Sequence, residues 1–337
     1  MKIAIVGAGN IGTAMAALFA SSGEAVTLVA RGHRLEVAAQ SGVCLEDRGT
    51  LHAGPVTAVA ALDTVQDAVF LCVKAQDLGA AVVANAGGIG PRTLVIPMIN
   101  GLPFWFFYDA GRDVPLTDPD GRLASCLRPE QVLGAVLLMT VEMNAAGRAI
   151  STNTPTLSLA PVVKGADMSA VAKLIEVLNG AGVKTDLAAD IRQNVLVKLL
   201  ANIATNPLSA LIGCNLAEIG RSDTLRRLSF ALADEVRGWL EGDLGRKVPD
   251  NGWLGDLLLD AGDFPTSMLQ DARAGRRLEL DAIARAPMAL AGEGAMPLLA
   301  ALVAALDRAP RLPLDGLAAQ AALTQLLSHT HPERIRA

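Results

Sequence analysis

In this 337-residue chain, Lys2-Ile3-Ala4-Ile5-Val6 runs directly into Gly7-Ala8-Gly9-Asn10-Ile11-Gly12, and these eleven residues are the strongest indication of its fold. The first run, rich in Ile and Val, predicts a buried strand, and apolar residues at helical spacing up to Phe19 predict a helix directly after it. A G-x-G-x-x-G turn between a strand and a helix is typical of dinucleotide-binding domains. An ordinary glycine turn in a flavodoxin-like domain is the alternative.

Short apolar runs continue to alternate with helical patterns, at residues 25–29, 68–73 and 93–96. Strands that alternate with helices predict a parallel α/β sheet with right-handed crossovers. Three further β-like runs lack helical spacers and could extend this sheet through antiparallel pairs. They cover residues 132–141, 148–151 and 156–162.

After residue 188 the pattern changes to helices, and no convincing strand remains. The expected helices cover residues 191–203, 225–240, 267–284 and 298–306. The sequence therefore predicts an α/β protein with two domains. Residues 1–189 form a Rossmann-type, doubly wound, NADP-binding domain, and residues 190–330 form an all-helical substrate and catalytic domain.

Composition excludes several classes of protein. Lys and Arg number 29 against 34 Asp and Glu, a net charge of −5, so we expect neither a nucleic acid nor an anionic membrane as partner. No run of 18 residues is free of charges and breakers, so no membrane span is expected. Four scattered cysteines argue against a disulfide framework or a metal site. Because no export signal precedes the strand at Lys2, we expect a cytoplasmic protein.

Histidines occur only at positions 33, 52, 329 and 331. A mid-chain histidine acid or base is therefore excluded. Proton chemistry in the middle of the chain must come from a lysine, a carboxylate or the single tyrosine.

The end of the second expected strand bears on the choice of cofactor. NAD-binding domains usually carry Asp or Glu there, about 20 residues beyond the glycine turn, to hold the ribose 2′-hydroxyl. This chain has Arg31, His33 and Arg34, with no acid before Glu36. Cationic side chains suit a 2′-phosphate, so Arg31 above all favours NADPH over NADH. A solvated loop that is merely basic is the alternative.

One stripe of polar residues recurs every four positions along the helix that begins near residue 191. Its members are Asn194, Lys198, Asn202 and Asn206. Asparagine is a poor helix former, so its recurrence favours a functional face. A lysine flanked by amides fits a proton donor next to a carboxylate binder, and a solvated face remains equally open from spacing alone. Pro207 is expected to kink or end the helix.

Further along, Ser267 and Gln270 have the spacing of a capping box, which by itself explains Ser267. Glu279 follows a basic stretch of arginines. An isolated Glu in such surroundings is most often a surface ion-pair partner.

Taken together, these residues resemble the ketopantoate reductase (2-dehydropantoate 2-reductase) family. The resemblance rests on the N-terminal glycine turn, Val73-Lys74-Ala75-Gln76, Asn100-Gly101, Lys198 with Asn202, Asn206 and Pro207, and Thr266–Asp271 followed by Glu279 and Asp281. It implies a Rossmann domain and a helical domain with the active site between them. It also implies NADPH-dependent reduction of ketopantoate, a small 2-oxo acid, to pantoate in pantothenate biosynthesis.

The resemblance also assigns roles to residues of this sequence. Lys198 is the general acid, and Glu279 joins it in the catalytic set. The substrate-binding residues implied are Asn100, Asn202, Asn206 and Ser267. The cofactor-binding residues implied are Gly7, Gly9, Asn10, Ile11, Gly12, Arg31, Lys74 and Asn100.

Two departures from the family bear on the substrate. An aromatic segment, residues 104–108, is inserted after Asn100-Gly101, and Ile283-Ala284-Arg285 replaces the family's Ile-Asn-Gly. The aromatic segment could line the cleft, act as a lid, form a subunit contact in a homodimer, or anchor its own loop to the core. A reductase of a larger keto acid or of an imine, and a non-catalytic NADPH-binding sensor, remain alternatives.

Overall fold

The computed structural model describes residues 1–144 and 147–330, which divide into two compact units. Unit 1 consists of Met1–Ile99, Pro103–Val114 and Asp118–Asn194. Unit 2 consists of Asn100–Leu102, Pro115–Thr117 and the chain from Val195 onward. The division falls inside a helix after Asn194, a few residues beyond the domain boundary that the sequence suggests.

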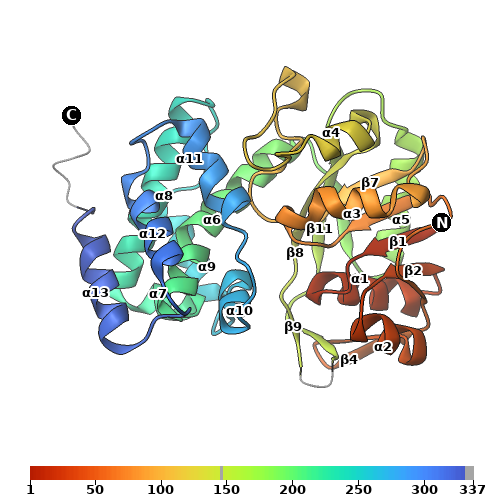
Figure 1. The fold of residues 1–337 in the computed structure, drawn as a ribbon, viewed down its shortest axis with the longest axis horizontal. Helices are drawn as coiled ribbons and strands as arrows, with labels where there is room; N and C mark the ends of the chain where they lie inside the picture. Colours follow the sequence, from red (N-terminus) through yellow and green to blue (C-terminus); the bar gives the residue numbers. More distant parts are fainter. Residues whose placement is uncertain (145–146, 331–337) are drawn as a thin grey trace. The chain divides into compact units, whose positions relative to one another are not determined.

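The centre of unit 1 is a parallel sheet with the strand order β5-β2-β1-β6-β7 (Figure 1). Its strands are β1 (Ile3–Val6), β2 (Val26–Val29), β5 (Thr57–Val59), β6 (Ala68–Leu71) and β7 (Leu94–Pro97). Ile3 lies opposite both Val26 and Ala68, and β1 is buried along its whole length. Strands covered on both faces read as continuous apolar runs, which is why the sequence revealed most of them. The predicted Rossmann-type sheet is confirmed.

Three more strands form a sheet in the order β12-β11-β8. They are β8 (Leu133–Leu138), β11 (Thr156–Pro161) and β12 (Lys184–Leu187). A bridge from Val95 to Val132 links the β7 edge to the start of β8, and β8 pairs with β11 in antiparallel fashion. The predicted antiparallel pairing holds for residues 132–141 with 156–162, but these strands form a sheet of their own, and residues 148–151 belong to a different sheet, where β10 pairs with β3 in parallel. Strand β12 was missed because its side chains are mostly exposed and polar.

A further small sheet, β4-β3-β10-β9, packs against the first helix, α1 (Asn10–Ser21). Its strands are β3 (Val43–Asp47), β4 (Thr50–Gly54), β9 (Val141–Met143) and β10 (Ala149–Ser151). The β3–β4 hairpin was not predicted from the sequence, because polar and charged residues interrupt its short apolar pattern. The other helices of unit 1 are α2 (His33–Ser41), α3 (Leu78–Ala84), α4 (Arg122–Cys126) and α5 (Met168–Gly180), with short 3₁₀ turns at Ala75–Asp77, Ala86–Gly88, Tyr108–Ala110 and Pro129–Gln131.

Unit 2 is helical throughout its described part, and no strand follows Leu187 among the described residues. The chain enters it along α6 (Ile191–Ile212). The remaining helices are α7 (Leu216–Arg221), α8 (Asp223–Gly242), α9 (Asn251–Asp260), α10 (Ser267–Arg273), α11 (Ala286–Ala291), α12 (Pro297–Arg308) and α13 (Gly316–Leu327), with a π-helical turn at Asp281–Arg285 that runs directly into α11. The predicted helical C-terminal region is confirmed.

Two helix predictions need correction. The helix expected over residues 267–284 is broken, because α10 ends at Arg273 and Gly275 then adopts a positive φ of +63°. Helix α6 does not end at Asn206, because Pro207 is accommodated inside it and the helix continues to Ile212. Thr205 donates from its hydroxyl to the Ala201 carbonyl one turn back, so side-chain bonding supplements the helix close to the proline.

Helix α6 is also, among the described residues, the helix long and apolar enough to cross a membrane by length and composition. However, 72% of its most apolar window is buried inside the protein. This burial is that of a core helix.

The aromatic segment, residues 104–108, is anchored within unit 1. Phe104, Trp105 and Phe106 are each no more than 3% exposed. Arg192 fixes the segment, since its guanidinium donates to the Phe106 carbonyl at 2.8 Å and to the Val162 carbonyl at 2.9 Å. Burial of these three rings favours the anchored loop among the alternatives that the sequence left open.

Candidate active site

The turn from β1 to α1 has the backbone geometry that the glycine motif requires. Gly7 has a φ of +108°, and a Cβ there would lie 2.8 Å from the Cys72 carbonyl oxygen. A Cβ on Gly12 would lie 1.8 Å from the Gly7 carbonyl oxygen, so the helix packs on the turn only with glycine at this position. These are the roles expected of the first and third glycines of a dinucleotide-binding turn.

Gly9 differs from its neighbours because the space beside it is open. A Cβ on Gly9 would meet nothing closer than the Cys72 carbonyl oxygen at 4.0 Å. Gly9 is also the N-cap of α1, with no side-chain cap, and the first turn of α1 has no acidic residue. Amide groups at a helix N-terminus attract a phosphate, so the turn formed by Gly7, Gly9, Asn10, Ile11 and Gly12 fits a dinucleotide pyrophosphate.

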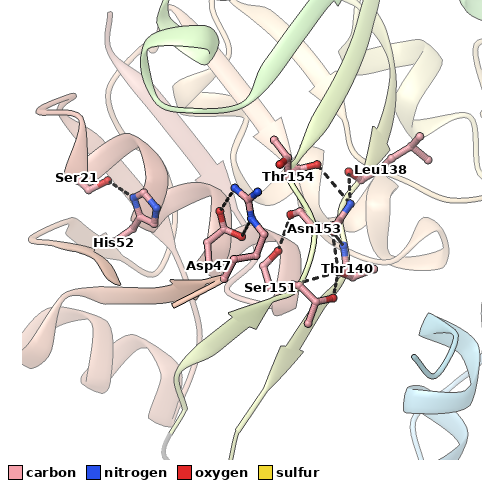
Figure 2. A network of polar contacts seen from close by, with 10 residues as sticks. Ser21, Asp47, His52, Leu138, Thr140, Ser151, Asn153 and Thr154 are labelled. Atoms are coloured by element: carbon pink, nitrogen blue, oxygen red, sulfur yellow. Dashed lines mark hydrogen bonds and ion pairs between the residues drawn. The ribbon is translucent and has the colours of Figure 1, made fainter. Parts of the chain in front are cut away.

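Asn10, the first residue of α1, is held by the small sheet. Its side-chain amide donates to the Val141 carbonyl at 3.0 Å. The preceding residue, Thr140, donates from its backbone amide and from its hydroxyl to the Asn153 side-chain oxygen, each at 2.7 Å (Figure 2). This network therefore fixes the strand on which Asn10 rests, and with it the entry to α1.

Cationic side chains follow β2 beside the glycine turn. Arg31 is exposed directly after the strand, and Arg34 donates from its guanidinium to the Ala8 carbonyl inside the turn. His33, by contrast, lies near Glu36 on the surface of α2. From the sequence, Arg34 was expected only as one of three cationic side chains after the second strand. Arg34 lies in the first turn of α2, the helix that follows β2, and this position could have indicated a role for it at the glycine turn.

Lys74 comes from the neighbouring strand. It follows β6, which pairs with β1, and it precedes the 3₁₀ turn at Ala75–Asp77. Ligands of open α/β sheets bind at the carboxyl ends of the strands. Lys74 and the glycine turn both lie at that end of the sheet.

In unit 2, Lys198 lies in α6 and is half-buried. Burial lowers the pKa of its ammonium from 10.5 to about 8, although the carboxylate of Glu279 acts in the opposite direction. Glu279 is itself 6% exposed, so the expectation of a surface ion-pair partner is wrong. The nearby arginines pair with aspartates instead: Arg276 with Asp271, and Arg277 with Asp281.

The asparagines of α6 are not on a solvated face. Asn206 is 5% exposed, and its side-chain oxygen accepts a hydrogen bond from the Thr205 hydroxyl at 3.1 Å. Among the described residues, the Asn202 side-chain nitrogen is buried and has no hydrogen-bond partner. A buried amide N–H without an acceptor costs free energy, so this group is suited to an acceptor brought by a ligand.

Ser267 is exposed as the first residue of α10, and the helix is capped by its neighbour. The Thr266 hydroxyl accepts from the Leu269 amide at 3.1 Å and donates to the Ser209 hydroxyl at 3.0 Å. The predicted capping box is therefore shifted by one residue, and Ser267 is not needed as a cap. The bond to Ser209 holds the start of α10 against α6, close to the asparagine stripe.

Asn100 follows β7 in the chain but belongs to unit 2, where it is half-buried. Asn194, the first member of the stripe, belongs to unit 1. The substrate and catalytic residues expected from the sequence therefore all lie in unit 2. The expected cofactor residues lie in unit 1, except Asn100, which was expected to contact both ligands.

Known proteins match both parts of this arrangement. The family described as Ketopantoate reductase PanE/ApbA matches residues 3–104, and its C-terminal part matches residues 190–308. A 2-dehydropantoate 2-reductase from Mesorhizobium japonicum is 35% identical over 297 residues, which cover 85% of this chain and 90% of that protein. The chain belongs to the ketopantoate reductase family. It is therefore an oxidoreductase that depends on a nicotinamide dinucleotide, which disfavours the non-catalytic sensor.

Other relatives agree with this membership. A 2-dehydropantoate 2-reductase from Pyrococcus horikoshii is 27% identical, over 84% of this chain and 88% of that protein. The crystal structure of a putative ketopantoate reductase from Ralstonia solanacearum has a TM-score of 0.82 at 28% identity, covering 91% of this chain and 98% of that chain. A D-mandelate dehydrogenase structure with NADH and anilino(oxo)acetate shares the fold at a TM-score of 0.75 and 18% identity, over 97% and 99% of the two chains.

The family matches leave out residues 105–189. Most of the aromatic segment lies in this gap, together with the small sheet's strands β9 and β10. Hydrogen bonds within this chain hold these parts of unit 1 in place: those of Arg192 hold the aromatic segment, and those of Asn153 hold Thr140 at the start of β9.

Proposed function

We propose that this protein reduces 2-dehydropantoate to pantoate with NADPH and that Lys198 is the general acid. The observation that carries the proposal is a lysine whose pKa burial lowers to about 8, which interacts with buried Glu279 and lies one helical turn before Asn202, whose buried amide N–H lacks an acceptor among the described residues. The names of the relatives support the substrate.

NADPH, when bound, supplies the hydride that reduces the keto carbon. Negative charge then develops on the keto oxygen, and the Lys198 ammonium stabilises this charge and transfers a proton to it, which completes the hydroxyl group. The buried carboxylate of Glu279 limits the fall of the Lys198 pKa, so the lysine still holds its proton at neutral pH. Glu279 can also accept a hydrogen bond from a substrate hydroxyl.

The amides and the serine of unit 2 hold the substrate in this proposal. The Asn202 side-chain nitrogen donates to the substrate carboxylate, since it is the group whose hydrogen bond is missing within the protein. Asn206, Ser267 and Asn100 supply further polar contacts. Amide and hydroxyl donors can bind a 2-oxo acid without a bidentate arginine.

The cofactor occupies unit 1 in this proposal. The helix N-terminus and the open backbone at Gly9 would hold the pyrophosphate, Arg31 would bind the 2′-phosphate, and Lys74 would contribute a further cationic contact to the cofactor. The absence of an acid between Arg31 and Glu36 supports NADPH over NADH. We expect the enzyme to act in the cytoplasm, and a homodimer would be detected by measuring its mass in solution.

The test is NADPH oxidation by the purified protein with 2-dehydropantoate. We expect turnover in the wild type, and a fall in kcat of roughly 10²–10⁴-fold in Lys198→Ala with NADPH affinity little changed. Full kcat in Lys198→Ala, with NADPH binding lost instead, would contradict the assigned role. Val197→Ala, on the same helix but outside the polar stripe, serves as the matched control.

A larger 2-oxo acid, or an imine, is the second candidate. The observation in its favour is Ile283-Ala284-Arg285, where the family has Ile-Asn-Gly. A panel of 2-oxo acids that increase in bulk, assayed with the same protein, separates the two. Faster turnover of a bulky acid than of 2-dehydropantoate would assign the second substrate class.

A further inference from the structure

The helix that follows Glu279 contains a π-helical turn in which one carbonyl has no donor within its own helix. Within the π-helical turn Asp281–Arg285, the Ala286 amide donates to Asp281, five residues back. The Ala282 carbonyl would next find its helical donor at residue 287, but Pro287 has no N–H. The sequence therefore leaves the Ala282 carbonyl without a partner inside its own helix. π-helical turns are rare and occur frequently at functional sites.

The missing partner comes from the segment after β7. The Leu102 amide donates to the Ala282 carbonyl at 2.8 Å, and Ala282 is 2% exposed. Gly101 makes this approach possible, because its φ is +90° and a Cβ there would lie 2.5 Å from both the carbonyl carbon and the carbonyl oxygen of Ala282. A larger residue at position 101 would clash with backbone atoms of Ala282, and backbone atoms cannot move away by a change of rotamer as a flexible side chain can.

This contact joins the segment that carries Asn100 to residues of unit 2. The chain on either side of Asn100–Leu102 is part of unit 1, whereas these three residues group with unit 2. The Ala282 carbonyl lies three residues beyond Glu279, whose carboxylate acts on Lys198. A single backbone hydrogen bond thus ties the Asn100 segment to the turn that follows the buried glutamate.

We propose that Gly101 and the π-helical turn Asp281–Arg285 are positioning elements that hold Asn100 in the substrate-binding unit. This inference rests on the proposed function, because it gives Asn100 a place beside the 2-oxo acid. Gly101 touches neither substrate nor cofactor in this proposal. It acts through Asn100, by allowing the Leu102 amide to reach Ala282.

The experiment is a double-mutant cycle. Asn100→Ala removes a hydrogen bond to a charged substrate, so kcat/KM for the 2-oxo acid should fall by about 10–100-fold, mainly through KM. Gly101→Ala should produce the same changes in KM and kcat, because its Cβ displaces the segment that carries Asn100. The double variant should be no worse than Asn100→Ala alone, since Gly101 then has nothing left to position.

Gly23→Ala is the matched control. Gly23 has a φ of +88°, almost that of Gly101, but nothing lies within 4 Å of its added Cβ. Gly23→Ala introduces the strain of a side chain at a positive φ but no clash with neighbouring atoms, so the KM of this variant should equal that of the wild type. A wild-type KM in Gly101→Ala, or losses that simply add up in the double variant, would overturn the positioning role.

A second measurement needs no variant. Because the Leu102 amide is bonded to a buried carbonyl, it should exchange with solvent as slowly as amides inside α12, and exchange at the rate of an open loop would overturn the proposal. Slow exchange without turnover of any 2-oxo acid contradicts the proposed function alone. Turnover with fast Leu102 exchange contradicts the positioning role alone.

Discussion

Lys198 is a residue whose chemistry depends on its surroundings. In water a lysine holds its proton too tightly to be an efficient acid near neutral pH, and burial in α6 lowers its pKa to about 8. Glu279 opposes this shift, so the ammonium stays charged at pH 7 while remaining acidic enough to give up its proton. If Lys198 is the general acid, as proposed, the pair sets the pH range in which reduction can occur.

We predict that kcat/KM for the 2-oxo acid is constant below about pH 8 and falls about tenfold per pH unit above it. The sign follows from the role of the acid: above its pKa of about 8, Lys198 has lost the proton that reduction requires. The measurement is a pH profile in the direction of reduction. In Lys198→Arg, whose guanidinium stays protonated, activity should be low and this alkaline fall should vanish. An alkaline fall that persists in Lys198→Arg would assign it to another group.

The two arginines beside the glycine turn should have separable effects. Arg31→Ala should raise KM for NADPH by about 10–100-fold and leave KM for NADH unchanged, because only NADPH has the 2′-phosphate. Arg34→Ala should raise KM for both cofactors, because Arg34 bonds to the Ala8 carbonyl of the turn itself. Steady-state kinetics with each cofactor tests this, with the exposed His33→Ala as control. Equal losses for both cofactors in Arg31→Ala would remove its assigned role.

At the level of elements, the local sequence pattern predicts which strands and helices form, whereas contacts with distant parts of the chain determine where some of them begin and end. The parallel strands and α6 could be foreseen, because continuous apolar runs and +4 spacing are local features. The end of α6 could not, since Pro207 is tolerated within a long packed helix. The cap of α10 moved from Ser267 to Thr266, whose hydroxyl also reaches Ser209, 57 residues away in the chain. Such a partner cannot be read from a four-residue pattern.

The aromatic segment gives a prediction at this level. Arg192→Ala removes two charge-assisted hydrogen bonds to carbonyls and the ion pair to Asp109 at 3.1 Å. We expect a loss of about 1.5–3 kcal/mol in stability and faster proteolysis near the exposed residues 109–113, with kcat little changed. Thermal unfolding and limited proteolysis measure this. Arg112→Ala, which loses only a contact with the Phe107 ring, is the control. A fall in kcat with unchanged stability would instead indicate a lid.

For the whole molecule, the sequence predicts a ligand for each half, and that assignment stays a prediction, but the sequence did not indicate that Asn100 groups with unit 2. The cofactor turn is local, and Lys198, Asn202 and Asn206 lie on one helix. By contrast, the Asn100 segment bonds to unit 2 at the Ala282 carbonyl, and buried Glu279 interacts with Lys198, 81 positions earlier in the chain. Both depend on contacts between segments far apart in sequence, which periodicity does not encode.

This division of labour predicts where each ligand slows amide exchange. NADPH alone should protect residues 7–13 in unit 1, with a stabilisation that approaches 2.7 kcal/mol at about 100 times its Kd. Pantoate added to the NADP⁺ complex should protect residues 198–206 and 279–283 in unit 2. Hydrogen exchange read by mass spectrometry measures both, and Arg31→Ala should weaken the first effect at a fixed NADPH concentration and leave the second unchanged when NADP⁺ is saturating. Protection of 198–206 by NADPH without protection of 7–13 would reverse the assignment of cofactor and substrate to the two units.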